Sequence, residues 1–370
     1  MERSSLTGER AGESEGRSPS VEIELRLGAV DTTAVEKRPD IDHRMERASV
    51  ASEPRERSAP AKRRARERVG ESEGRSPSVE IDVRRWSHEA MATVYEVYAV
   101  HADLTYAAQA AQAAFELLDR LERELSRFLP NSDIARINHL DAGASTRVAP
   151  STLECLGIAR HMFDLTGGAF DVSIGTGLAS LELDHDESVV RATTRGVRID
   201  LGGIGKGYAV DLMAELLEEW EVPIALVHGG FSSMLALEPP AARPGWPLTL
   251  SDPADPSRRL ERLTVRQTAL GASGVRKRDH IVDPRTGDPV RGRRAAWVTL
   301  PRPHGGAAAA VADALTTASM LLAPDEIDAL CRNSPGLEAW ILDDAGLLHF
   351  GRGNAAGESE GRSPSEKDGD

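Results

Sequence analysis

The stretch RIDLGGIGKGYAVD, residues 198–211, places a glycine-rich loop with one lysine between an apolar run and a run of helix-forming residues. A P-loop would need a glycine at position 200 and a hydroxyl-bearing residue after the lysine, but Asp200 and Gly207 stand there. The dinucleotide-binding fingerprint also fails, because Tyr208 occupies the place of its third glycine. We therefore expect a strand, a tight loop and a helix here, with neither of the two common nucleotide-binding templates.

The composition narrows the class of protein. The chain has 370 residues, enough for one large domain or two small ones. Its formal net charge of −14 argues against a nucleic-acid-binding surface, which is usually basic. Cys155 and Cys331 are far apart and lack CxxC partners, which indicates neither a disulfide framework nor a zinc site.

The chain as written carries no targeting signal. No apolar run approaches the length of a membrane span, and the polar N-terminus lacks the apolar core of a signal peptide. We therefore expect a cytoplasmic protein without a membrane span. A periplasmic or membrane-associated protein is the alternative if the true N-terminus differs from the one given.

Low-complexity sequence flanks a globular region. The nonamer GESEGRSPS occurs at 12–20, 70–78 and 357–365. The flanks are rich in Arg, Glu, Ser, Pro and Gly and poor in aromatic residues, a composition that cannot bury a core. We predict a disordered N-terminal extension over 1–78, one globular domain over 79–352 and a disordered C-terminal tail over 353–370.

Within the globular region, hydrophobic periodicity predicts both helices and strands. The predicted helices are 104–129, 151–168, 207–220 and 307–323. The predicted strands are 79–86, 92–100, 196–202, 223–230, 280–284 and 295–300, with a further strand directly after 169–171 and a closing hairpin over 339–350. A capping box from Ser151 to Glu154 should start the second helix. Paired strands mixed with a few helices indicate the α+β class, with mixed sheets.

Two short motifs carry side chains suited to chemistry. Asp313 and Thr317 are four residues apart on a predicted helix, so that both side chains leave the same face and could offer hard oxygen ligands to Mg²⁺. The structural alternative is a helix-end acid and a threonine that bonds back to a carbonyl. His280 precedes the turn in HIVDPRTGDPV and could act as a general base or be structural. Phe170 could belong to the core or stack on a ligand ring.

The order of the motifs is more specific than any one of them. MAT (91–93), SRFLPNSDIARIN, GGAFDVSIG, IDLGGIGKGYAVD, HIVDPRTGDPV and ADALTTA follow one another along the chain. This succession resembles the FAD:protein FMN transferase (ApbE) family over about 88–350. The resemblance implies a single flavin-transferase domain. It also implies an enzyme that transfers FMN from FAD to a threonine or serine hydroxyl of a target protein, releasing AMP, with Mg²⁺ at the FAD pyrophosphate.

The resemblance also assigns site residues by motif position. It implies that Asp313, Thr317 and the carbonyl of Gly203 approach the metal. It places FAD against Met91, Phe128, Ala169, Phe170, Asp171, Asp200, Lys206 and His280. His280 matches the family histidine that is proposed to activate the acceptor hydroxyl. Under this interpretation, the glycines of the loop let the backbone approach the pyrophosphate-bound metal.

Two alternatives keep the same site. Water could replace the acceptor hydroxyl, giving an FAD pyrophosphatase that produces FMN and AMP. The chain could also be a flavin-binding protein without turnover, because two departures from the family pattern lie near the expected flavin pocket. These are the short loop after Gly175 and the position after VHGG, where Phe231 replaces the usual acidic or amide residue.

Overall fold

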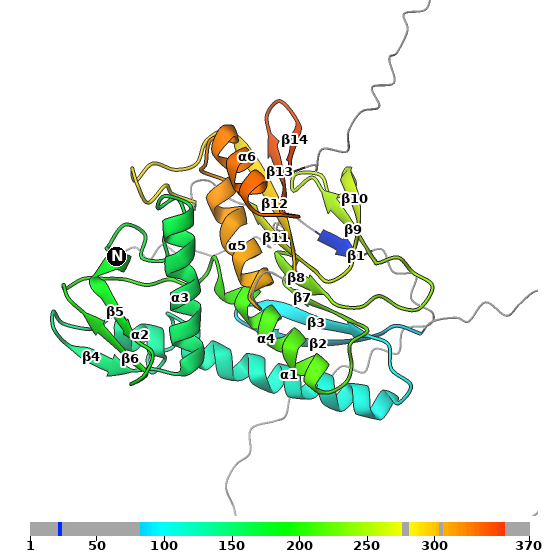
Figure 1. Ribbon diagram of the computed structural model, residues 1–370, viewed down its shortest axis with the longest axis horizontal. Coiled ribbons are helices and arrows are strands. Elements are labelled where there is room, and N and C mark those ends of the chain that lie inside the picture. The colour runs from blue at the N-terminus through cyan, green and yellow to red at the C-terminus, as the bar shows by residue number, and fades with distance from the viewer. Residues whose placement is uncertain (1–20, 24–81, 276–280, 303–305, 352–370) are drawn as a thin grey trace, which may run out of the picture. The chain divides into compact units, whose positions relative to one another are not determined.

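The computed structural model describes residues 21–23, 82–275, 281–302 and 306–351 (Figure 1). Its centre is an antiparallel sheet with the strand order β14-β13-β12-β11-β8-β7-β3-β2. In that order the strands are Leu347–Phe350, Glu338–Asp343, Arg293–Pro301, Thr268–Gly274, Ser233–Ala236, Ala225–Gly229, Thr93–Ala99 and Arg84–Ala90. The sheet and its helices confirm the predicted α+β class.

The described residues also contain two smaller sheets, six α-helices and one short 3-10 helix, Leu178–Ser180. One small sheet has the order β1-β9-β10 (Val21–Ile23, Trp246–Ser251, Arg259–Val265), and the other has the order β4-β6-β5 (Ser145–Arg147, Val189–Ala192, Leu181–Asp184). The helices α1 to α6 are Leu104–Leu125, Asp133–Ile137, Pro150–Leu165, Gly205–Glu219, Ala308–Ser319 and Pro324–Asn333.

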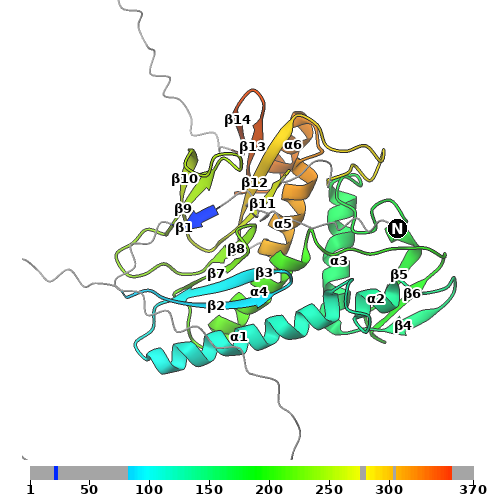
Figure 2. The ribbon, with the colours of Figure 1, turned by 180° about the vertical axis from the view of Figure 1, so that it is seen from behind.

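Each face of the large sheet buries its own hydrophobic cluster. On β3, Val97 belongs to the cluster shared with the helices, whereas Tyr98 faces the other cluster, as the alternation of a strand requires. The helical cluster draws on α1, α3, α4 and α5. The second cluster includes Trp246 and Leu248 of β9. The helices therefore cover one face of the sheet and β9 covers the other, as the opposite views of Figures 1 and 2 show.

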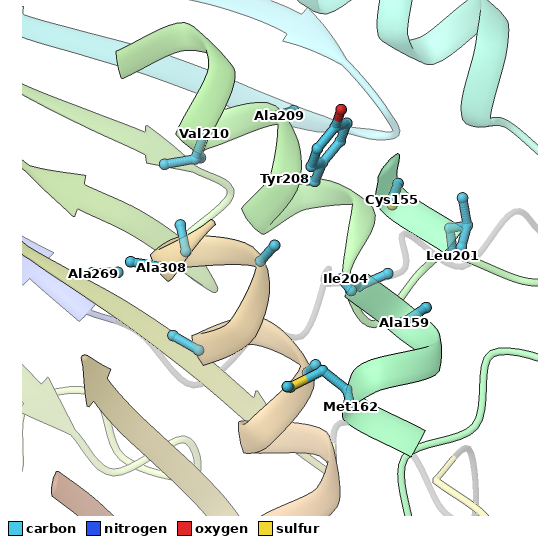
Figure 3. Packing of buried hydrophobic residues seen from close by; sticks show 14 of the residues in the cluster. Cys155, Ala159, Met162, Leu201, Ile204, Tyr208, Ala209, Val210, Ala269 and Ala308 are labelled. Carbon is cyan, nitrogen blue, oxygen red and sulfur yellow. The ribbon is translucent and has the colours of Figure 1, made fainter. Parts of the chain in front are cut away.

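Helix α5 is the most enclosed of the described helices, with ten of its 12 residues buried. Its sequence AAAVADALTTAS consists mainly of small residues, which allows other elements to approach its backbone closely. A Cβ at Gly207 of α4 would lie 2.2 Å from the Ala309 carbonyl oxygen, and one at Gly271 of β11 would lie 2.5 Å from that of Ala312. Figure 3 shows this core, with Met162 of α3, Val210 of α4 and Ala269 of β11. Glycine is thus required where α4 and β11 meet α5.

The two helices also exchange hydrogen bonds through buried carboxylates. Asp211 of α4 accepts from the backbone N–H groups of Ala309 (2.9 Å) and Ala310 (2.8 Å) at the start of α5. In return, Asp313 of α5 accepts from the N–H of Gly207 in the first turn of α4 (3.1 Å). Each helix therefore satisfies N-terminal amides of the other, amides that have no partner within their own helix.

Three segments that the sequence predicts as strands are not strands. Over 196–202, the backbone of Ile199 bonds in both directions to the side chain of Asn138, and the N–H of Asp200 donates to the Val172 carbonyl, so no ladder forms. The residues after Asp171 form a turn instead of a strand. Of the predicted strand 280–284, His280 lies outside the described residues, and the remainder makes an isolated bridge from Val282 to Pro289.

The predicted capping box of α3 is also wrong. The helix begins after Ala149, which makes no side-chain cap. Ser151 instead donates its hydroxyl hydrogen to Glu124 of α1, and Glu154 accepts from the hydroxyl of Tyr208 on α4 (2.7 Å). Both side chains are used to join helices, and this tertiary use overrides the local signal.

The other elements lie close to their predicted positions. The helix predicted over 104–129 ends at Leu125, and Asp103 caps its start by accepting from two backbone N–H groups. The first predicted strand begins at Arg84 as β2, and it pairs with β3 as expected. Val21–Ile23 forms β1, although it lies within the extension predicted to be disordered. Across the described ranges, no helix is both long and apolar enough to cross a membrane.

The glycine contact at α5 leads to a stability prediction. Gly207→Ala should lower the free energy of unfolding by about 1–3 kcal/mol or more, because the new methyl group meets rigid backbone. Gly205→Ala is the matched control in the same helix turn, since its Cβ would lie 3.7 Å from its nearest neighbour, Leu201, and the variant should change stability by less than about 0.5 kcal/mol. Urea unfolding of both variants measures this, and equal stabilities would contradict the packing argument.

The buried carboxylate of Asp211 gives a pH prediction. Burial raises the pKa of this group from 3.8 to about 8, although the two backbone N–H groups lower it. Between these values the folded state holds a proton that the unfolded chain releases, so the contribution of Asp211 to stability falls as the pH rises. The free energy of unfolding of the wild type minus that of Asp211→Asn should fall between pH 5 and pH 8, by up to about 1.4 kcal/mol per pH unit.

Urea unfolding at a series of pH values measures this difference. Asp186→Asn, at an exposed carboxylate in the turn between β5 and β6, is the control and should give a difference that changes little with pH. A flat difference for Asp211→Asn would show that the carboxylate is ionised throughout.

Candidate functional site

Predicted site residues from three separate segments of the chain line one cavity of about 580 Å³. These residues are Ala169, Phe170, Asp171, Asp200, Gly203, Lys206, Asp313 and Thr317. The cavity lies between the turn after α3, the loop before α4, the end of β11 and one side of α5. The motifs that are far apart in the sequence thus meet at one place.

A second cavity of about 240 Å³ adjoins the first and contains the other two described candidates, Met91 and Phe128. The two cavities share Asp200, Gly202 and Lys206 in their walls. Every predicted site residue within the described ranges therefore lines one of two adjoining cavities. His280 lies outside those ranges, but the next two residues, Ile281 and Val282, line the larger cavity.

Asp313 and Thr317 project from α5 into the larger cavity, as their spacing predicts. The Asp313 carboxylate is buried, and its Oδ2 lies 3.6 Å from Lys206 Nζ. Burial raises the pKa of Asp313, while Lys206 and the Gly207 N–H oppose this rise. A Cβ on Gly203 would lie 3.4 Å from Thr317 Oγ1, so the glycine loop and the threonine hydroxyl are adjacent.

This set of groups fits a hard divalent cation. It offers one carboxylate, one hydroxyl and the backbone of the glycine loop, and all of their donor atoms are oxygen. Within the described parts of the chain, no group of three or more His, Cys, Asp or Glu side chains could hold a metal. A cation at this place would therefore take few protein ligands, as Mg²⁺ does when waters and substrate phosphate complete its shell. The bound cation would add to the positive charge that Lys206 supplies beside the buried Asp313 carboxylate.

Asp171 and Asp200 also shape the loops on which they lie. Asp171 Oδ1 accepts from the N–H (2.8 Å) and the hydroxyl (2.6 Å) of Ser173, and its Oδ2 accepts from the Gly175 N–H (2.8 Å). Asp200 Oδ1 accepts from the Gly202 N–H (3.0 Å), and its Oδ2 pairs with Arg127 at 3.2 Å. Both carboxylates hold tight turns at the cavity wall.

The first turn of α4 offers less to a ligand than the sequence suggests. The N–H of Gly205 donates to the Leu201 carbonyl (2.7 Å), and that of Gly207 donates to Asp313. Gly207 thus serves helix packing, and not the approach of a ligand. Lys206, whose Nζ donates to the Gly202 carbonyl at 3.0 Å, is the cation that lines both cavities from this loop.

The aromatic residues differ in exposure. Phe170 is 3 % exposed and belongs to the core cluster, and its ring edge would lie 3.2 Å from a Cβ at Gly203. Phe128 is 79 % exposed, and the Arg127 guanidinium lies 4.5 Å from its ring centroid. Phe231 is also exposed and contacts the buried His228 edge to face. Of the rings at the two cavities, Phe128 is therefore the one most available for stacking.

Sequence reasoning missed two polar side chains of the larger cavity, Ser232 and Ser273. Ser273 lies on β11 and hydrogen-bonds to hydroxyls of α5. The sequence contained no local signal for it, because only the pairing of β11 with α5 brings these groups together. Asp211 was missed for the same reason, although it lies four residues after Gly207 on the same helix.

The matches to known proteins agree with this arrangement. The profile of the ApbE family matches residues 91–178 and 173–341, all within the predicted domain 79–352. A relative from Treponema pallidum, named FAD:protein FMN transferase, is 27 % identical over 285 residues, which is 63 % of this chain and 76 % of the relative. A relative of the same name from Salmonella typhimurium is 23 % identical over 296 residues, which is 69 % of this chain and 82 % of the relative.

Solved structures show the same fold. The ApbE protein from Thermotoga maritima superposes with a TM-score of 0.64 at 22 % identity, covering 73 % of this chain and 97 % of that one. The flavin transferase ApbE from Vibrio cholerae gives a TM-score of 0.62 at 20 % identity, covering 72 % of this chain and 97 % of that one. With its motifs gathered at one cavity and the family profile matched over most of its length, this chain belongs to the ApbE family.

Proposed function

We propose that this protein is a magnesium-dependent FAD:protein FMN transferase. It would move FMN from FAD to a threonine or serine hydroxyl of a target flavoprotein and release AMP. The observation that carries the proposal is the meeting of Asp313, Thr317, Gly203 and Lys206 at one cavity. The names of the curated relatives support the same activity.

The reaction exchanges the phosphoanhydride bond of the FAD pyrophosphate for a phosphate ester bond to the acceptor. The acceptor hydroxyl oxygen forms a bond to the phosphorus of the FMN half, the bond from that phosphorus to the AMP oxygen breaks, and the hydroxyl proton passes to a base. Mg²⁺, held by Asp313, Thr317 and the Gly203 backbone, would neutralise charge on the phosphate oxygens. Lys206 would add a fixed positive charge beside the same oxygens.

The two adjoining cavities suit a substrate with two ring systems joined by a pyrophosphate. Lys206 and Gly202 lie in the wall that both cavities share, which is where a charged linker between two halves would pass. The smaller cavity carries Met91 and the exposed ring of Phe128. Such a ring can stack on an aromatic group, because most of its surface is exposed to solvent.

His280 is the proposed base. A threonine hydroxyl is a weak nucleophile until its proton is removed, and neutral imidazole can accept that proton near neutral pH. The proposal for His280 rests on the family motif and on the position of the following residues, Ile281 and Val282, in the cavity wall.

Removal of the proposed metal ligand should abolish turnover. Asp313→Ala deletes the carboxylate of a small ligand set, so magnesium-dependent release of AMP should fall at least a hundredfold at limiting Mg²⁺. AMP release is followed by chromatography with FAD, Mg²⁺ and an acceptor protein. Asp325→Ala, at an exposed acid in the first turn of α6, is the control and should behave like the wild type. Full activity of Asp313→Ala at limiting Mg²⁺ would refute the metal assignment.

Removal of the base should separate binding from transfer. His280→Ala should still bind FAD, but transfer to the acceptor should fall by about a hundredfold to ten-thousandfold. Flavin fluorescence on the denatured acceptor measures transfer, and His161→Ala, on the exposed surface of α3, is the control. Release of AMP and FMN by the wild type without labelling of the acceptor would identify a pyrophosphatase. Binding of FAD without release of AMP would identify a flavin-binding protein without turnover.

A further inference from the structure

Three hydroxyl groups meet between β11 and α5, beside the proposed metal site. Ser273 Oγ lies 2.8 Å from Thr316 Oγ1 and 3.3 Å from Thr317 Oγ1. Thr316 Oγ1 in turn lies 2.7 Å from the carbonyl oxygen of Asp313. Ser273 and Thr317 both line the larger cavity, whereas Thr316 is fully buried.

The direction of this chain of hydrogen bonds follows from counting hydrogens. A hydroxyl carries one hydrogen, and a carbonyl oxygen can only accept. Thr316 must therefore donate to Asp313, which makes Ser273 the donor to Thr316. The hydrogen of Ser273 is then used, so in the contact with Thr317 the threonine is the donor.

This direction fixes how Thr317 presents its oxygen. Its hydrogen points toward Ser273, so its lone pairs are left for the other side, where Gly203 lies. A metal ligand must offer a lone pair and not a hydrogen. We propose that Ser273 is a positioning residue that holds the Thr317 hydroxyl with its lone pairs facing the metal site; this inference rests on the proposed function.

The fold explains why a β11 residue can do this. Ala269, Gly271 and Ser273 alternate along the strand and share the face toward α5. The missing side chain of Gly271 lets the α5 backbone approach at Ala312, one turn before Thr316. The close approach brings the short side chain of Ser273 within reach of two successive threonines.

Without Ser273, the Thr317 hydroxyl would be free to rotate. A threonine in a helix commonly turns its hydrogen to the carbonyl three or four residues earlier, and other rotations would point the hydrogen into the cavity. In these orientations the lone pairs are not held toward the metal. Loss of partners that orient metal ligands typically weakens metal binding 10–100-fold.

The test is a titration of Mg²⁺ with FAD bound, followed by calorimetry and by the shift of the unfolding temperature. Ser273→Ala should raise the apparent Kd for Mg²⁺ about tenfold and leave the metal-free unfolding temperature nearly unchanged. Ser273→Thr keeps the hydroxyl and should restore most of the affinity. Ser257→Ala is the matched control, because Ser257 is an exposed serine outside both cavities and donates its hydroxyl hydrogen to Asp255 (2.6 Å).

A double-mutant cycle shows whether Ser273 acts through Thr317. In a Thr317→Val background, Ser273→Ala should weaken Mg²⁺ binding no further. Wild-type affinity in Ser273→Ala, or full additivity in the cycle, would overturn the positioning role while leaving the proposed function intact. If the wild type itself shows no response to Mg²⁺, the proposed metal site is wrong and this inference fails with it.

Discussion

The rest of the structure depends on the reciprocal contact between α4 and α5. Asp211 of α4 satisfies the first N–H groups of α5, and Asp313 of α5 satisfies one in the first turn of α4. The contact is possible only because Gly207 has no side chain where it meets the Ala309 carbonyl. It fixes the axial position of α5, and thereby the place at which Asp313 and Thr317 enter the cavity.

The two buried carboxylates in this contact differ in what surrounds them. Asp211 has two backbone donors, and burial raises its pKa to about 8. Asp313 has one backbone donor and Lys206 at 3.6 Å, and burial raises its pKa as well. Asp313 lines the cavity, whereas Asp211 does not. The same type of side chain therefore holds the scaffold at one end of the contact and is open to a ligand at the other.

The sequence correctly predicted the elements whose signals are local. Prediction failed where the structure of a segment depends on a hydrogen-bond partner that is distant in the sequence. The helices at Leu104 and Ala308 follow from periodicity, and their bounds are nearly right. The run 196–202 resembles a strand, but the Asn138 side chain, about 60 residues earlier, binds the backbone that a ladder would use. At the candidate site, motif order predicted residues that line the two cavities. The contacts of Ser273 depend on the packing of β11 against α5, which no local pattern encodes.

The geometry also discriminates among the carboxylates that the motifs nominated. Asp171 and Asp200 bond to nearby backbone groups or to Arg127, so their charge is already compensated by the turns that they form. Asp313 is buried and less fully compensated, which makes it the carboxylate that gains most from an added cation. Because the same carboxylate accepts from Gly207, a cation bound there would act directly on the contact that positions α5. Binding of such a cation would therefore be coupled to the packing of the two helices through a single side chain.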